Sequence, residues 1–213
     1  MIRELFPPDV VTVTHRPGDW EGALLPSERP TVARAVPKRV REFTAGRMCA
    51  RRALGELGIE DFAIEVGPQR SPVWPEGVCG SISHTDDWCG AVVTRIGAIV
   101  SLGLDVEPAR PLDDDLTDLV CGPEELVLAR RTEWAVDPRK LLFSAKESVF
   151  KANYPLAPEM LEFRAVAVEL DAATGTFVAR RVDGGPQLAG GRELRGRFAF
   201  DADNVFTSVC VLA

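Results

Sequence analysis

Residues 103 to 107 read Gly-Leu-Asp-Val-Glu and close an apolar run. In an extended chain, alternate side chains point to the same side, so Asp105 and Glu107 are expected on one face of a strand. Two neighbouring carboxylates repel each other unless a proton or a cation lies between them. A divalent cation such as Mg²⁺, which prefers oxygen ligands, would meet that need. The alternative is a polar strand end with two solvated acids.

The apolar residues around this segment follow the periods of an α+β protein. Spacings of three and four predict helices at 27–35, 37–57, 123–131 and 138–154. Alternation and turn signals predict strands at 10–13, 62–66, 78–84, 91–96, 98–106, 165–170, 177–181, 193–200 and 205–212. The acidic, proline-containing stretch 109–118 is predicted to be a loop.

The composition is that of a soluble globular protein, with 46% hydrophobic and 27% charged residues among 213. This length suits one domain or two small lobes that share a core. The chain has no apolar run of membrane-spanning length and no signal-peptide pattern, so we expect a cytoplasmic protein with no membrane partner. Its five scattered cysteines form no Cys-x-x-Cys pair, which indicates neither a zinc site nor a disulfide framework.

The charge is unevenly distributed along the chain. The net charge is −7, but residues 34–52 alone carry +6, which leaves −13 for the remainder. The overall acidity argues against nucleic-acid binding. A compact basic patch on an acidic protein suits a small polyphosphate ligand or an acidic protein partner. The alternative is a solvated helix face.

An arginine interrupts the apolar stripe of the helix predicted at 37–57. Arg47 occupies a position of the stripe that also contains Phe43 and Ala50. A buried charge needs a partner, and Arg51 lies one turn further on, so the two guanidinium groups can converge on one anion. The alternatives are that Arg47 extends to solvent or pairs with an acid.

Ser83 and His84 end the strand predicted at 78–84, and they are expected beside the strand that carries Asp105. On the helix predicted at 138–154, Glu147 and Lys151 are four residues apart and therefore share one face. A structural histidine and a surface salt bridge are the alternatives. Together, the acids and basic groups have the composition of a metal-assisted phosphoryl-transfer site.

Five short motifs occur in a specific order between residues 40 and 155. They are Phe43-Thr-Ala-Gly-Arg-Met-Cys-Ala-Arg51, Trp74-Pro75, Gly80-Ser-Ile-Ser-His84, Gly103-Leu-Asp-Val-Glu107 and Phe143-Ser-Ala-Lys-Glu-Ser-Val-Phe-Lys-Ala152. This set resembles the signature of the 4′-phosphopantetheinyl transferases. It is most similar to the broad-specificity subgroup that serves siderophore and polyketide pathways.

The resemblance implies a pseudo-dimer of two similar α+β lobes, with coenzyme A and Mg²⁺ in the cleft between them. Residues 1–103 would form the nucleotide-binding lobe, and residues 104–213 the lobe with the metal and the catalytic helix. The implied enzyme is a monomer that transfers the phosphopantetheine arm of coenzyme A to a carrier-protein serine and releases adenosine 3′,5′-bisphosphate. Its partners would be apo acyl or peptidyl carrier proteins of polyketide, fatty-acid or nonribosomal peptide synthases.

The resemblance also assigns roles to individual residues. By position, the Mg²⁺ ligands would be Asp105, Glu107 and Glu147, and Mn²⁺ could replace the metal. Glu147, or a water held by a metal ligand, would remove the proton from the carrier serine, while Lys151 would contact the pyrophosphate. The residues expected to bind coenzyme A are Arg47, Arg51, Arg70, Ser83, His84, Lys146 and Lys151.

Two other functions are compatible with the same residues. A magnesium-dependent phosphotransferase or pyrophosphohydrolase acting on nucleotides would use the same acids, with water as the nucleophile in the hydrolytic case. A carrier-binding scaffold protein without catalytic activity would need none of them.

Overall fold

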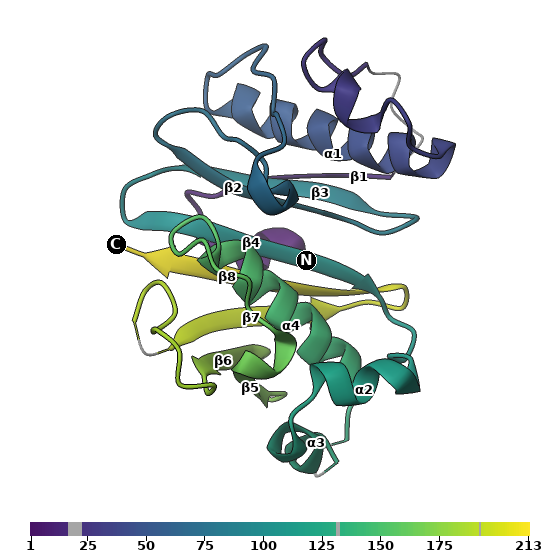
Figure 1. Ribbon diagram of the computed structural model, residues 1–213, viewed down its shortest axis with the longest axis vertical. Coiled ribbons are helices and arrows are strands. Elements are labelled where there is room, and N and C mark those ends of the chain that lie inside the picture. The colour runs from purple at the N-terminus through teal and green to yellow at the C-terminus, as the bar shows by residue number, and fades with distance from the viewer. Residues whose placement is uncertain (17–22, 131–132, 192) are drawn as a thin grey trace.

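The computed structural model of the protein describes residues 1–16, 23–130, 133–191 and 193–213, which form two antiparallel sheets. The smaller sheet has the strand order β1-β3-β2, from β1 (Val11–His15), β2 (Val78–His84) and β3 (Cys89–Arg95). The larger has the order β4-β8-β7-β6-β5, from β4 (Ile99–Pro108), β5 (Val166–Asp171), β6 (Thr176–Arg181), β7 (Leu194–Phe200) and β8 (Asn204–Leu212). Figure 1 shows the two sheets following one another along the long axis of the molecule.

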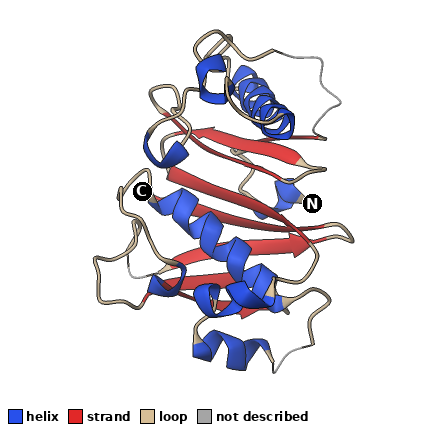
Figure 2. Cartoon of the chain, turned by 45° about the vertical axis from the view of Figure 1, so that its right-hand side comes forward, coloured by secondary structure: helices blue, strands red, loops and turns tan. Residues whose placement is uncertain are grey.

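One long helix covers each sheet (Figures 1 and 2). Helix α1 (Pro37–Glu56) begins at a proline, whose missing N–H is harmless in the first turn, and packs Ala50, Ala53 and Leu54 into the core of the smaller sheet. Helix α4 (Pro138–Asn153) is capped by Asp137, whose side chain accepts a hydrogen bond from the backbone N–H of Arg139. Its apolar face enters the core of the larger sheet.

Serine side chains join the two sheets where strands β2 and β4 meet. The hydroxyl of Ser81 accepts a hydrogen bond from the backbone N–H of Leu104, and that of Ser83 accepts one from Val106. These side-chain bonds take the place of a backbone ladder, because β2 and β4 belong to different sheets. The end of β2 is therefore held beside the acids of β4.

The shorter elements connect these layers. They are the 3₁₀ turns η1 (Ile2–Leu5), η2 (Arg29–Val32), η3 (Pro68–Arg70) and η4 (Phe163–Ala165), and the helices α2 (Asp114–Val120) and α3 (Pro123–Ala129). None of the helices in the described part of the chain is long and apolar enough to cross a membrane.

The α+β prediction is confirmed, and the long helices and most strands lie within a few residues of their predicted bounds. The predicted strand at 62–66 is wrong, since this segment contributes only a bridge between Val66 and Pro72. The predicted loop at 109–118 contains the start of α2. The short helix predicted at 27–35 is a 3₁₀ turn, and the predicted end of the helix at Arg131 lies outside the described residues.

The predicted lobe boundary between residues 103 and 104 falls within β4. All ten residues of this strand lie in the larger sheet, where β4 pairs with β8 from Ile99 to Pro108. The turn between β3 and β4 separates the two sheets in sequence.

Gly103 allows α4 to lie directly on β4. A Cβ atom at this position would overlap the backbone carbonyl of Ser148 and would lie 3.1 Å from the Cβ of Ala152. We therefore expect Gly103→Ala to push α4 away from the sheet and to lower the free energy of unfolding by about 1–3 kcal/mol, as overpacking does. Urea unfolding followed by circular dichroism measures the change.

Gly97→Ala is the matched control, because nothing lies within 4 Å of a Cβ built at Gly97. This variant should stay within about 0.5 kcal/mol of the original protein. Equal losses of stability in the two variants would contradict the packing role of Gly103.

Candidate active site

One face of α4 carries a polar stripe toward β4. Lys140, Ser144, Glu147 and Lys151 follow one another at spacings of four, three and four, which places them on a single side of the helix. The apolar residues of α4 lie on other sides and enter the core. Because Gly103 brings the helix close to β4, the stripe reaches the carboxylates of that strand.

Asp105 is the most buried of the three acids Asp105, Glu107 and Glu147, with 3% of its surface exposed. The Nζ of Lys151 lies 2.7 Å from Oδ1, to which the hydroxyl of Ser83 also donates a hydrogen bond at 3.2 Å. The hydroxyl of Ser144 donates to Oδ2 at 2.7 Å. Two helix side chains and one from β2 thus hold this carboxylate, which offsets the cost of burying it.

Two further carboxylates share the same surroundings as Asp105. Glu107 lies on β4 with its Oε2 at 3.2 Å from the Nζ of Lys140, and Glu147 projects from α4 into the same pocket. Burial raises the pKa of both glutamates, the charge of Asp105 raises each further, and the nearby lysines act in the opposite direction. This end of the pocket therefore has a surplus of negative charge.

His84 faces the acids from the end of β2. Its Nε2 lies 2.9 Å from a guanidinium nitrogen of Arg39. Arginine can only donate, so Nε2 is the acceptor and the imidazole is neutral. Burial is the main cause of the lowered pKa of His84, with the charge of Arg39 acting in the same direction and that of Glu42 opposing it.

The acids, His84 and Lys151 line one pocket of about 750 Å³ between the sheets. The smaller sheet contributes Ser83 and His84, and the larger contributes Asp105 and Glu107. Aromatic side chains, among them Trp74, Phe143 and Phe150, form an apolar part of its wall. The pocket can thus hold a ligand with a charged and an apolar portion.

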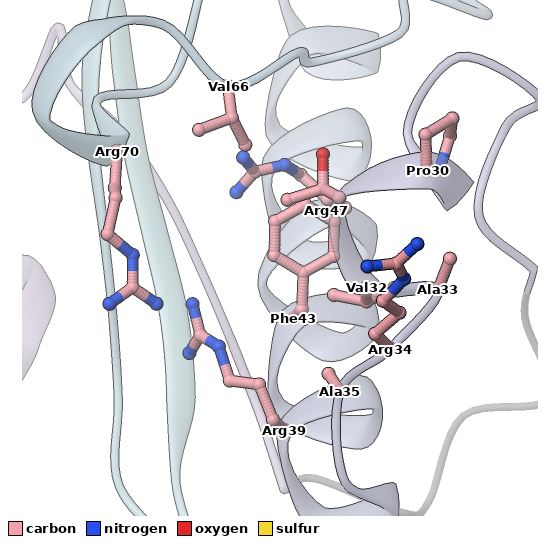
Figure 3. Close-up of a pocket in the computed structure, with 11 residues that line it drawn as sticks. Pro30, Val32, Ala33, Arg34, Ala35, Arg39, Phe43, Arg47, Val66 and Arg70 are labelled. Atoms are coloured by element: carbon pink, nitrogen blue, oxygen red, sulfur yellow. The ribbon is translucent and has the colours of Figure 1, made fainter.

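A second pocket of about 610 Å³ is lined by four arginines (Figure 3). Arg34, Arg39, Arg47 and Arg70 come from three segments of the chain, and Arg39 and Arg70 also line the pocket with the acids. Among the residues that the structure describes, the side chains of Arg34 and Arg70 have no hydrogen-bond or ion-pair partner. Such a concentration of guanidinium groups favours an anionic ligand.

Arg47 is held in place at the floor of the second pocket. Its Nε donates to the carbonyl of Ile64 at 2.8 Å, and its guanidinium carbon lies 4.2 Å from the centre of the Phe43 ring. Burial lowers the pKa of Arg47 to about 10, so the side chain remains protonated at neutral pH. Arg47, which interrupts the apolar stripe of α1, is therefore a fixed cation at the second pocket.

The structure does not place Arg51 and Lys146 in these pockets. Arg51 binds both carboxylate oxygens of the fully buried Glu28, at 2.7 and 2.6 Å, so the predicted convergence of Arg47 and Arg51 on one anion is not what the structure shows. Lys146 points from α4 to Glu125 on α3, with Nζ 2.8 Å from its Oε2. Both side chains have internal acids as partners.

Sequence reasoning did not name Lys140 or Ser144, and it counted Arg34 and Arg39 only as part of the basic segment 34–52. A usable signal existed for three of these four residues. Arg39, Phe43 and Arg47 lie at successive spacings of four on α1, which places an aromatic ring between two arginines on one face. Lys140 and Ser144 continue the stripe of Glu147 and Lys151 toward the start of α4. Arg34 precedes α1 and had no such pattern.

In the described ranges, no three histidine, cysteine, aspartate or glutamate side chains are already arranged to hold a metal ion. Lysines neutralise Asp105 and Glu107 instead. Arginines surround one end of the adjoining pockets, and carboxylates with lysines surround the other. An anionic group could bind the arginines directly, whereas a second anionic group beside the carboxylates would need a cation between them. Charged groups held at fixed positions favour transfer by positioning and charge stabilisation.

Two family models match this chain. The description "4′-phosphopantetheinyl transferase N-terminal domain" applies to residues 27–94, and "4′-phosphopantetheinyl transferase superfamily" to residues 101–197. The 4′-phosphopantetheinyl transferase Svp of Streptomyces mobaraensis is 43% identical, over 100% of this chain and 90% of that protein. PptT of Mycobacterium tuberculosis is 38% identical, over 87% and 85%. Enterobactin synthase component D of Escherichia coli O157:H7 is 38% identical, over 54% and 55%.

The matched segments include both long helices, strands β2, β5 and β6 in full, and the polar residues of the two pockets, whereas β1 and β8 lie outside them. The relatives cover most of this chain at identities well above the level at which unrelated sequences align. The chain belongs to the 4′-phosphopantetheinyl transferase superfamily and is an enzyme of that kind.

Proposed function

We propose that the protein transfers the 4′-phosphopantetheine arm of coenzyme A to a serine of an apo carrier protein, with Mg²⁺, and releases adenosine 3′,5′-bisphosphate. The observation that carries this proposal is the pair of adjoining pockets, one with four arginines and one with three carboxylates and a lysine. Coenzyme A has a phosphorylated ribose at one end of its nucleotide and a pyrophosphate at the other, so it needs positive charge in two places.

The nucleotide end of the donor would lie in the second pocket. Arg47 and Arg70 are the basic side chains there that the family resemblance also implicates, and Arg34 and Arg39 complete the set. Arg39 donates a hydrogen bond to His84, so the histidine would be oriented toward the phosphate on the ribose of the donor. The pyrophosphate would then extend toward Lys151, and the pantetheine arm toward the aromatic wall.

Mg²⁺ fits the donor set of the first pocket, because hard cations prefer the oxygen ligands that Asp105, Glu107 and Glu147 provide. The raised pKa values of the two glutamates indicate the same demand for positive charge. These three residues would hold the ion, and Mn²⁺ could replace it. When bound, the metal would supply positive charge to the pyrophosphate oxygens.

In the transfer step, the carrier serine oxygen would attack the phosphorus atom nearest the pantetheine arm. The bond from that phosphorus to the bridging oxygen would break, and adenosine 3′,5′-bisphosphate would leave with the electron pair. Glu147, or a water held near it, would take the serine proton, because a raised carboxylate pKa suits a general base. Lys151 would stabilise the charge that develops on the phosphoryl oxygens.

The second substrate would be an apo acyl or peptidyl carrier protein of a polyketide, fatty-acid or nonribosomal peptide synthase. Its serine must reach the pocket that contains Glu147. The basic segment 34–52, part of which lines the second pocket, would also attract an acidic carrier surface and speed the encounter.

The decisive experiment incubates the protein with an apo carrier domain, coenzyme A and Mg²⁺ and follows the carrier by mass spectrometry. The carrier should gain the mass of phosphopantetheine. Hydrolysis of coenzyme A without any gain, across several carriers, would favour a pyrophosphohydrolase instead. Carrier binding without transfer or hydrolysis would favour a scaffold protein.

Isosteric variants test the acids. Asp105→Asn and Glu147→Gln remove a charge but keep the size of each side chain, and both should lower the transfer rate at least about 100-fold because several kcal/mol of charge stabilisation is lost. The mass-shift assay measures the rate. Glu169→Gln, at an exposed site on β5, is the control and should be unaffected. Full activity in both acid variants would refute the proposed metal site.

The arginine pocket is tested through the affinity for coenzyme A. Arg70→Met should raise KM for coenzyme A by about tenfold or more, because a charge-assisted contact to a phosphate is lost, while kcat changes little. Arg195→Met, which removes an exposed arginine on β7, should leave KM unchanged. An unchanged KM in Arg70→Met would show that the nucleotide lies elsewhere.

The raised pKa of Glu147 predicts a pH effect on stability without metal. The contribution of Glu147 to the free energy of unfolding is complete at pH values below its ordinary pKa of 4.5. This contribution is lost as the pH rises through the raised pKa of the folded state. In EDTA, the free energy of unfolding should therefore fall between pH 5 and pH 8 more steeply in the original protein than in Glu147→Gln. Urea titrations at several pH values provide the measurement. Parallel pH profiles would contradict the buried, repelled state of Glu147.

A further inference from the structure

Lysine is rare in this chain. Its 25 basic residues are arginines except at Lys38, Lys140, Lys146 and Lys151. Three of these four lysines lie on α4, the helix that carries Glu147. The protein thus uses arginine for its exposed charges and its second pocket, and keeps lysine largely for one helix.

Two of the α4 lysines bind the two acids of β4. The Nζ of Lys151 lies 2.7 Å from Oδ1 of Asp105, and the Nζ of Lys140 lies 3.2 Å from Oε2 of Glu107. Lys140 is nearly buried, with 8% of its side chain exposed, and Lys151 retains 26% on the side of the pocket. Each carboxylate of the strand therefore has one ammonium group of its own.

An ammonium group resembles a small metal cation more closely than a guanidinium group does. It is a compact point charge on a flexible stem, whereas guanidinium is a planar fork that would bind a carboxylate through two parallel hydrogen bonds. A single Nζ atom lies 2.7 Å from Oδ1, an oxygen that could also bind a metal ion. The choice of lysine thus leaves the carboxylate able to exchange its cation.

We propose that Lys140 and Lys151 neutralise the strand acids until a divalent cation arrives, and that metal binding displaces Lys151 from Asp105. This inference rests on the proposed function, since it presumes that Asp105 is a metal ligand. After displacement, the Nζ of Lys151 stays within reach of the pocket, where Ser83 Oγ and the carbonyl of Leu104 are its other partners. Metal binding would then release a lysine for the phosphates of the donor.

The exchange has a thermodynamic consequence that does not involve catalysis. A lysine that competes with the metal for Asp105 weakens metal binding. Removal of the lysine must therefore strengthen metal binding. Lys151→Met should bind Mn²⁺ about tenfold or more tightly than the original protein, as expected for coupled sites, with coenzyme A left out. Lys140→Met should show a smaller gain, since its contact with Glu107 is longer. Isothermal titration calorimetry and the electron paramagnetic resonance signal of free Mn²⁺ report the affinities.

Lys146→Met is the matched control on the same helix. Its ammonium group binds Glu125 and the carbonyl of Val120, away from the strand acids, so Mn²⁺ affinity should be unchanged. Circular dichroism confirms that each variant is folded, and Lys151→Gln replaces Lys151→Met if the latter does not fold.

The outcomes separate this inference from the proposed function. An equal or weaker Mn²⁺ affinity in the Lys151 variant, no Mn²⁺ binding by either protein, or an equal gain in the Lys146 control would overturn the exchange. The carrier mass-shift assay on the original protein tests the transfer activity independently. Phosphopantetheine transfer together with unchanged Mn²⁺ affinity in Lys151→Met would reject the exchange and leave the proposed function intact.

Discussion

The contact between the polar stripe of α4 and the acids of β4 is the constraint on which the site depends. It needs a glycine at position 103, because a side chain there would overlap the backbone of α4 at Ser148. It also needs partners for a buried carboxylate, which Ser83, Ser144 and Lys151 supply to Asp105. This contact therefore needs both close packing at Gly103 and charge compensation around Asp105.

The segments around the two sheets contribute opposite kinds of charge to one ligand-binding region. The smaller sheet and α1 contribute arginines and His84, and the larger sheet and α4 contribute the carboxylates. Serine side chains of β2 hold the two sheets together at the point where these groups meet. A donor with phosphates at two separate places would be bound across this junction, which gives a physical reason for building the site between two sheets.

Much of this arrangement could be predicted from the sequence, because strong periodicities and short motifs indicate its helices, strands and site residues. The stripe of α4 and the alternation at Asp105 and Glu107 are local patterns, and the structure brings these residues into one pocket. The partner of Arg51 was not local, since Glu28 lies 23 residues away and is buried only through tertiary packing. Likewise, β4 pairs with the distant β8 and not with the adjacent β3, and α2 formed from an acidic segment.

The central claim is that Asp105 and Glu147, from distant parts of the chain, meet around one cation. Anomalous diffraction from crystals grown with Mn²⁺ and coenzyme A tests this most directly. The account predicts an anomalous peak within about 2.5 Å of carboxylate oxygens of both residues, with the Nζ of Lys151 moved away from Asp105. A peak elsewhere, or one that only one of the two carboxylates contacts, would contradict it.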